Sequence, residues 1–235
     1  MADGLEDLEP PIECRDVFPR DINDDGAIVG TLGFDDPNYS LGFVFEDGQW
    51  TFLTSSPEGM SCSAHAINAH GEVVGNRDVE QDDGTVLNVA FRWTAEGGFV
   101  DLPSPPHDAS NLVDIGDDGT AVGWDRFITL DAEPLVWGRT TTFPPPPVPS
   151  YSFTFRDQTR IGELMAIRNP EDQPAFQFES WLRDTTGRWQ FIRSPWKERL
   201  LTLFEINDLG QAYGAAIPAG NQQFTVAPIR IAGTV

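Results

Sequence analysis

A nine-residue phrase recurs along the chain and constrains its fold more than any other feature. It reads Ile-Asn-Asp-Asp-Gly-Ala-Ile-Val-Gly at residues 22–30 and returns, with substitutions, at 67–75, 115–123 and 206–214. A decayed copy occupies 155–162. The isoleucines that begin the four clear copies are 45, 48 and 91 residues apart, and the last interval is two periods of about 46. Self-similarity at this period predicts a chain built from five copies of one supersecondary unit.

Each phrase is followed by two further short segments of strand character, separated by a glycine turn. In the second unit, residues 89–93 lead through Gly97 and Gly98 to residues 99–102. Short runs rich in Val, Ile, Phe and Trp, bounded by Asn, Asp and Gly, are typical of β-hairpins. Each unit therefore reads as four strands, which is the size of one blade of a β-propeller.

The expected fold is all-β: a single-domain, five-bladed β-propeller, 1–235, made of four-stranded antiparallel blades. The fifth unit ends after three strands, and residues 5–11 resemble the fourth strand and exit loop at 100–106. The N-terminal strand is therefore expected to close the last blade, because closure removes an exposed sheet edge. The expected units span 12–53, 54–102, 103–143, 144–192 and 193–235, the last together with 4–9.

The repeated phrase, followed by Ala-Phe-x-Trp and Asp-Leu, resembles the HAF repeat, also called the probable extracellular repeat. The best match is residues 67–102, and the resemblance covers nearly the whole chain, weakly in the fourth unit, which lacks the Asn and the turn Gly. The family carries no agreed catalytic residues, so the resemblance implies an architecture and no catalytic site.

The charge of the chain excludes several classes of partner. It has 37 acidic and 15 basic side chains, a net charge of −22. Such a surface repels phosphate backbones and anionic lipids, so neither nucleic acid nor a membrane is an expected partner. A cationic partner remains compatible with this charge. The acidic start of the chain does not resemble a signal peptide, so a cytoplasmic protein is expected, or an extracellular one whose leader has been removed.

Two cysteines can form at most one disulfide bond, which cannot stabilise a fold of this size, so a hydrophobic core is expected to stabilise it. Cys14 and Cys62 precede the first strands of adjacent units. Two free thiols are the expected state, with a disulfide as the alternative. The three histidines, His65, His70 and His107, lack the spacing of zinc ligands and have no recognisable nucleophile beside them.

Acidic residues offer two candidate sites. Asp21, Asn23 and Asp25 have the alternating oxygen spacing of a calcium loop, although the equivalent residues of the other units do not keep it. An ordinary hairpin turn is the preferred interpretation, and calcium, the one cofactor considered, is the alternative. Asp21, Asp114 and Glu205 occupy one repeat position and are expected to line one rim of the central channel. Backbone hydrogen bonding is their expected role, and paired catalytic carboxylates are the alternative.

The tryptophans divide into core and candidate ligand-binding residues. Trp124 and Trp196 are expected in loops on the face opposite the repeated turns, where an aromatic side chain would stack on a sugar or anchor a peptide. Segments 76–88 and 124–134 are among the long loops expected on that face. The other five lie on strands, where packing between blades explains them: Trp50, Trp93, Trp137, Trp181 and Trp189.

The function indicated is a noncatalytic, monomeric binding or interaction module that recognises a protein or glycan through the long-loop face at Trp124 and Trp196. The alternative is a small glycosidase-like or calcium-assisted hydrolase with carboxylates near the central channel. A deep pocket that holds two carboxylates indicates the hydrolase, and a shallow aromatic surface indicates the binding module.

Overall fold

The structure is a computed structural model. It describes residues 8–36, 39–54, 60–102, 110–125, 133–138, 152–158, 164–169, 179–184, 186–193, 199–207 and 211–218. In these ranges the regular secondary structure consists of 17 β-strands. None of the described segments forms a helix that is long and apolar enough to cross a membrane.

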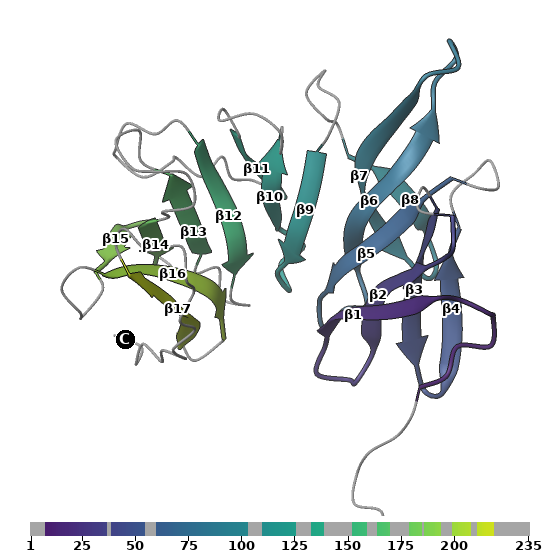
Figure 1. Ribbon diagram of the computed structural model, residues 1–235, viewed down its shortest axis with the longest axis horizontal. Coiled ribbons are helices and arrows are strands. Elements are labelled where there is room, and N and C mark those ends of the chain that lie inside the picture. Colours follow the sequence, from purple (N-terminus) through teal and green to yellow (C-terminus); the bar gives the residue numbers. More distant parts are fainter. Residues whose placement is uncertain are drawn as a thin grey trace, which may run out of the picture.

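The strands form five antiparallel sheets in chain order, numbered here first to fifth (Figure 1). The first sheet contains β1 (Asp16–Ile22), β2 (Ile28–Gly33), β3 (Ser40–Glu46) and β4 (Gln49–Leu53). The second contains β5 (Cys62–Ile67), β6 (Val73–Glu80), β7 (Val86–Thr94) and β8 (Gly98–Asp101). The third contains β9 (Ser110–Ile115), β10 (Ala121–Asp125) and β11 (Glu133–Trp137). The fourth contains β12 (Ser152–Gln158), β13 (Leu164–Asn169), β14 (Glu179–Arg183) and β15 (Trp189–Ile192), and the fifth β16 (Arg199–Ile206) and β17 (Ala212–Pro218).

These sheets confirm the all-β fold and the antiparallel units. In each sheet the first strand pairs with the second through the hairpin that the repeated phrase predicts, including the decayed copy, where β12 pairs with β13. The expected fourth strand of the third unit, the third strand of the fifth unit and most of the closing N-terminal strand lie outside the described residues. Leu8 and Glu9, at the end of that expected strand, belong to no strand.

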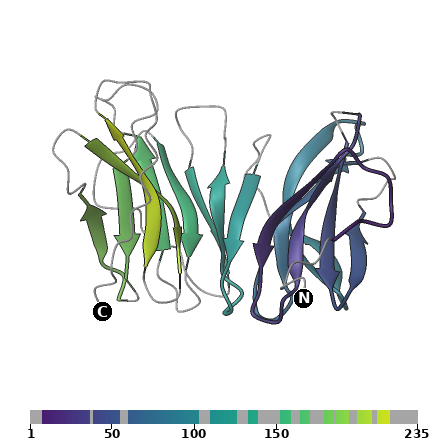
Figure 2. The ribbon, with the colours of Figure 1, turned by 60° about the horizontal axis from the view of Figure 1, so that its bottom comes forward.

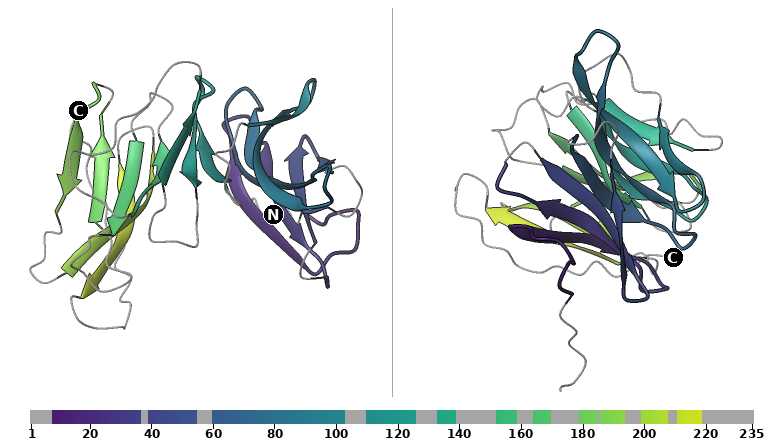
Figure 3. Two further views of the ribbon diagram at one scale, coloured as in Figure 1. Left: turned by 90° about the horizontal axis from the view of Figure 1, so that it is seen from above. Right: turned by 90° about the vertical axis from the view of Figure 1, so that its right-hand side faces the viewer.

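Successive sheets stand side by side, as three views of the ribbon show (Figures 1 and 2; Figure 3). The first sheet contacts the second through β2 and β5, the second contacts the third through β6 and β9, and the third contacts the fourth through β10 and β12. The fourth contacts the fifth through β12 and β16. In the left view of Figure 3 the first two sheets and the last two lie on opposite sides of the molecule, with the third between them.

Apolar side chains fill the spaces between neighbouring sheets. Val29 and Val44 of the first sheet pack in one cluster with Cys62, Ala64 and Ile67 of the second. Between the fourth and fifth sheets, the buried pair Leu203 and Ile206 contacts Leu182 and Ile192. A buried Val, Leu or Ile side chain contributes about 1.5–3 kcal/mol, so these interfaces hold the sheets together.

The first strand of each sheet carries a β-bulge at the same position of the repeat. The strand pairing skips one residue in β1, β5, β9, β12 and β16. The skipped residues are Arg20, His65, Val113, Arg156 and Phe204. A bulge bends the strand and increases its local twist, so the same bend recurs at the start of all five sheets.

The bulge explains the glycine that ends the repeated phrase. A Cβ at Gly75 would lie 2.0 Å from the Ser63 carbonyl oxygen, and one at Gly123 would lie 1.8 Å from that of Asn111. The bulged strand therefore approaches its neighbour too closely for a side chain at this position.

The predicted long loop at 76–88 is largely strand instead. β6 continues to Glu80 and β7 begins at Val86, so only residues 81–85 connect the two strands. Polar side chains support this extension: the Asn76 amide donates to Asn88 Oδ1 at 3.1 Å, and the Asn88 amide donates to Asp78 Oδ1 at 3.0 Å. The sequence did not reveal the extension because Asn and Asp are typical of loops, whereas here their side chains pair across the hairpin.

Candidate functional site

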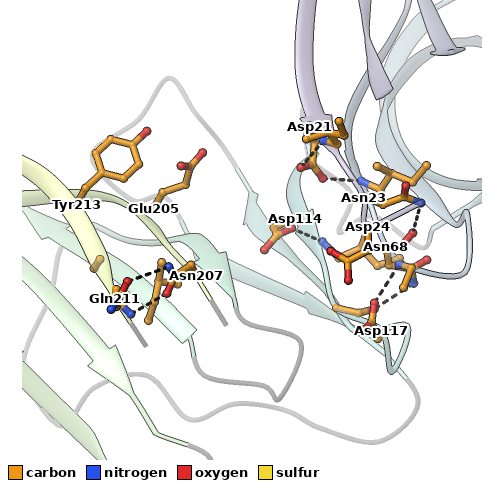
Figure 4. A pocket seen from close by; sticks show the side chains of 17 residues that line it. Asp21, Asn23, Asp24, Asn68, Asp114, Asp117, Glu205, Asn207, Gln211 and Tyr213 are labelled. Carbon is orange, nitrogen blue, oxygen red and sulfur yellow. Dashed lines mark hydrogen bonds between the residues drawn. The ribbon is translucent and has the colours of Figure 1, made fainter. Parts of the chain in front are cut away.

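A cavity of about 620 Å³ lies where the repeated hairpin turns meet (Figure 4). Its lining residues come from β1, β5, β9, β16 and β17 and from the turns that follow β1, β5, β9 and β16. Figure 4 shows Glu205 and Tyr213 on the side of the fifth sheet and Asp21 and Asn23 on the opposite side. Its volume is within the range of about 300–1,000 Å³ typical of ligand pockets.

Asparagine fixes the hairpin turns of the first, second and fifth sheets, which line this cavity. The side-chain oxygen of Asn68 accepts hydrogen bonds from the backbone N–H groups of His70 and Glu72, both at 3.0 Å. Asn23 Oδ1 accepts from the Ala27 N–H at 2.9 Å, and Asn207 Oδ1 accepts from the Gln211 N–H at 3.0 Å. The amide side chain thus satisfies backbone donors inside the turn, which explains the Asn of the repeated phrase.

The same asparagines connect neighbouring sheets. Asn23 Nδ2 donates to the backbone oxygen of Asn68 on the second sheet at 3.1 Å. Asn68 Nδ2 donates in turn to the backbone oxygen of Gly116 on the third sheet, also at 3.1 Å. A further hydrogen bond joins the second and third sheets, because Asp117 Oδ1 accepts from the Ala69 N–H at 2.9 Å. The wall of the cavity is therefore a set of turns held in register by side chains.

The three carboxylates predicted to share a rim do line this cavity. Asp21 accepts from the Ile22 N–H and, through its other oxygen, from the Ile67 N–H of the next sheet, both at 2.8 Å. Asp114 Oδ1 accepts from the Ile115 N–H at 2.8 Å. The expected backbone hydrogen bonding is thus confirmed for Asp21 and Asp114, while the Glu205 side chain is exposed.

The candidate calcium residues lie in the first hairpin. Two of them have hydrogen-bonded side chains, since Asp21 accepts from Ile22 and Ile67 and Asn23 accepts from Ala27. Asp25 is exposed in the turn. Within the ranges that the structure describes, no group of three or more His, Cys, Asp or Glu side chains is placed to hold a metal ion.

The two aromatic residues predicted to bind ligand are not among the lining residues described for the cavity. Trp124 is the penultimate residue of β10, paired with Asn111 and Pro134, and does not lie in the loop expected there. This end of β10 is the one farther from the repeated hairpin turn. Trp196 lies outside the described residues. The predicted packing between blades is confirmed for Trp93 and Trp137, which contact clusters shared by neighbouring sheets, whereas Trp50 packs against a cluster of the first sheet alone.

Cys14 and Cys62 are free thiols, as expected. Burial raises the pKa of the Cys62 thiol to about 12, so this side chain stays protonated. His65 donates from Nδ1–H to the Leu112 carbonyl oxygen at 2.6 Å, and burial lowers the pKa of its imidazole below the ordinary value. His70 is exposed in its turn, and His107 lies outside the described residues.

Sequence reasoning missed Tyr213 as a lining residue. The repeated phrase has valine at this position in the first three units: Val29, Val74 and Val122. Tyrosine at a position otherwise occupied by valine was the signal that could have identified it. Tyr213 pairs with Glu205 across β16 and β17, so the two cavity residues stand next to each other.

Comparison with known proteins gives distant structural neighbours. No family model and no curated protein sequence matches the chain. Among solved structures, selenomethionine-substituted virginiamycin B lyase from Staphylococcus aureus aligns over 88% of this chain and 68% of its own, with 14% identity and a TM-score of 0.38. A streptogramin B lyase structure aligns over 85% of this chain and 75% of its own, with 12% identity and a TM-score of 0.31.

Proposed function

We propose that the chain is a five-bladed β-propeller with HAF-like repeats that acts as a noncatalytic binding module. Five sheets in chain order, each beginning with a bulged strand and three of them with the asparagine turn as well, support the blade count. In this proposal the N-terminal strand, residues 4–9, completes the last blade. Pairing both ends of the chain in one sheet would leave no long free edge there.

The ligand that we propose is a cationic segment of a partner protein, bound in the cavity between the hairpin turns. The cavity lining carries this proposal: five carboxylates line it, and its described residues include no Lys, Arg or His. The acidic lining residues are Asp21, Asp24, Asp114, Asp117 and Glu205. A concave site lined by charges of one sign concentrates ligands of the opposite sign, here cations.

Binding rather than catalysis fits the roles of these carboxylates. Asp21, Asp114 and Asp117 are engaged by backbone N–H groups that fix the turns, which gives them a structural role. Glu205 and the adjacent Tyr213 are exposed and supply a charge and an aromatic ring to a ligand. The proposed site therefore lies on the face formed by the repeated hairpin turns, opposite the end of β10 at which Trp124 stands.

The test is binding of a fluorescein-labelled hexa-arginine peptide, with a hexaglutamate peptide as the ligand control. Glu205→Gln is expected to raise the Kd about two- to fivefold, the effect of one exposed charge. The matched variant Asp82→Asn removes an exposed carboxylate from the β6–β7 hairpin tip and is expected to leave Kd unchanged. Equal affinity for both peptides, or equal effects of both substitutions, would refute the cavity as the site.

A hydrolase is the second candidate because a cavity lined by Asp21, Asp114 and Glu205 is the feature expected of it; it ranks second because backbone N–H groups engage Asp21 and Asp114. Glycosidases use two such carboxylates, one as acid and one as base or nucleophile. A screen of nitrophenyl glycosides, with and without calcium, tests it. Hydrolysis that is lost in Glu205→Gln and kept in Asp82→Asn would favour the enzyme over the binding module.

A further inference from the structure

The hairpin of β6 and β7 extends beyond the strands next to it (Figure 1). β8 pairs with β7 only from Phe91 onward, and on the same edge the Leu102 N–H donates to the Ala90 carbonyl oxygen at 3.0 Å. The residue after Leu102 is a proline, which has no N–H to donate. No strand in the described part of the chain pairs with this outer edge of β7 at residues 86–89, so that stretch is an open strand edge.

Two residues of this edge point their backbone N–H and C=O groups away from β6. In an antiparallel ladder, hydrogen-bonded and non-hydrogen-bonded pairs of opposite residues alternate. The Gln81 N–H donates to the Thr85 carbonyl oxygen at 2.7 Å, so Val86, the next residue, belongs to a non-hydrogen-bonded pair. Val86 and Asn88 therefore present their N–H and C=O groups outward. The Ala90 carbonyl has the same direction, because it lies two residues further along the strand.

The side chains of the hairpin separate into an acidic and an apolar face. The strand register places Glu80 opposite Val86 and Asp78 opposite Asn88, and these four side chains share one face. Val86 is 49% exposed there. The apolar side chains of the other face are Val79, Leu87 and Val89. Residues 78–91 include no Lys, Arg or His, so the charge of this hairpin has a single sign.

We propose that the open edge of β7 binds an extended segment of a partner protein in which basic and apolar residues alternate. The segment adds to β7 as an antiparallel strand, and its backbone bonds to Val86 and Asn88 continue the sheet. Its basic side chains lie on the face of Glu80, where the stem of a Lys or Arg covers the exposed Val86 and the charged group reaches the carboxylate. Its apolar side chains lie beside Leu87 on the other face.

Charge decides between this partner and a second copy of the chain. Antiparallel pairing of two β7 edges would bring Asp78 and Glu80 of both copies onto one face, where like charges repel. Each chain also has a net charge of −22. A basic segment is attracted by the same carboxylates. The acidic face thus opposes the association between copies to which open strand edges are prone, and it favours a strand of opposite charge.

This site is separate from the cavity and does not depend on the ligand proposed there. Neither β6 nor β7 contributes a described residue to the cavity lining. Asp82 lies in the turn, outside the residues that pair with the added strand. Hexa-arginine has no apolar side chain to place beside Leu87, so the two sites are tested with different peptides.

The test is binding of a fluorescein-labelled Lys-Val-Lys-Val-Lys-Val-Lys peptide to the full chain. In the proposed register the lysines lie opposite Val86 and Asn88, so their backbone N–H groups point at β7. N-methylation of two central lysine nitrogens is expected to raise Kd about tenfold or more, because two hydrogen bonds are lost. N-methylation of two valine nitrogens is expected to change Kd less than about threefold. Both peptides have the same charge, so equal affinities would overturn the proposal.

Variants of the protein test the same edge. Val86→Pro removes an outward N–H that the β6–β7 ladder does not use, and it is expected to raise Kd about tenfold or more. Val86→Ala keeps this N–H and is the control, with a change below about threefold. Glu80→Gln is expected to raise Kd about two- to fivefold, the effect of one exposed charge. Equal effects of Val86→Pro and Val86→Ala would contradict strand addition.

If Val86→Pro does not fold, amide hydrogen exchange of the unmodified chain decides. Saturating peptide is expected to slow exchange at Val86 and Asn88 about tenfold or more, and to leave Leu87, whose N–H points to β6, unchanged. Absence of this protection would overturn the proposal even if the peptide bound in the cavity. Protection that appears without peptide as the protein concentration rises would assign the edge to a second copy and would also overturn it.

Discussion

The side-chain amide of Asn68 donates to the backbone oxygen of Gly116, one sheet further along the chain, at 3.1 Å. Its oxygen at the same time accepts from two N–H groups of its own turn. One buried residue therefore fixes the shape of a hairpin and its position relative to the next sheet. The arrangement of the hairpin turns around the cavity depends on such bonds.

Replacing Asn68 is expected to destabilise the protein. Asn68→Ala leaves two backbone donors and one backbone acceptor without their partner, at a cost of about 2–3 kcal/mol. Asn68→Asp keeps the acceptor inside the turn but loses the donor to Gly116 and to Glu72 Oε2, and it brings two carboxylates together, so it is expected to destabilise the protein as well. Urea unfolding measures both free energies. Asn207→Ala, at an exposed turn, is the control, and a cost equal to that of Asn68→Ala would contradict the role assigned to the inter-sheet bond.

Gly75→Ala is expected to cost about 1–3 kcal/mol, the range for overpacking a tight site. The added Cβ would lie 2.0 Å from the Ser63 carbonyl oxygen, and backbone must move to accept it. Gly97→Ala is the control, because its Cβ would meet only the Thr94 hydroxyl, at 2.9 Å, and that side chain can rotate. Thermal unfolding compares the two variants, and equal losses of stability would show that the bulge does not require glycine.

The stability of the protein is expected to depend on the protonation of His65. Burial lowers the pKa of His65 in the folded chain, while the unfolded chain takes up the proton near the ordinary value of about 6.5. The unfolded state then binds more protons as pH falls below about 6.5, so this contribution to stability is full above that pH and declines below it.

Comparing the Tm of wild type and His65→Gln at pH 7.5 and pH 5.5 measures this contribution. The loss of Tm at the lower pH is expected to be smaller in His65→Gln than in wild type. His70→Gln changes an exposed histidine of the same sheet, and its Tm is expected to fall between pH 7.5 and pH 5.5 by as much as that of wild type. An identical loss in all three proteins would rule out His65 as the titrating group.

The two thiols are expected to react at very different rates. Cys62 is buried and its pKa is raised to about 12, so it forms almost no thiolate at neutral pH, whereas Cys14 is partly exposed. Native protein is expected to consume one equivalent of Ellman's reagent quickly and the second only on unfolding. Cys14→Ser should abolish the fast phase, and a fast phase that persists would place Cys62 at the surface.

Much of the fold was predictable because the repeat fixes local structure. Asparagine or aspartate and glycine at fixed spacing define a hairpin turn, and alternating apolar residues define the strands on each side of it. These rules located the hairpins at 22–30 and 67–75 and the rim position of Asp21, Asp114 and Glu205. The β6–β7 hairpin was not predictable in the same way, because its Asn76, Asp78 and Asn88 are loop formers that pair across strands only in the folded chain.

The sequence by itself determined the unit: a strand, a hairpin turn with Asn or Asp and Gly, and three further strands, repeated along the chain. Only the tertiary structure decided what each repeated position contacts. The asparagine amide reaches the next sheet, the final glycine of the phrase makes room for a carbonyl oxygen, and Tyr213 stands beside Glu205 in a cavity. The physical reason is that hairpin geometry follows from neighbouring residues, whereas the asparagine bonds between sheets join residues 45 and 48 positions apart and exist only after the sheets have packed.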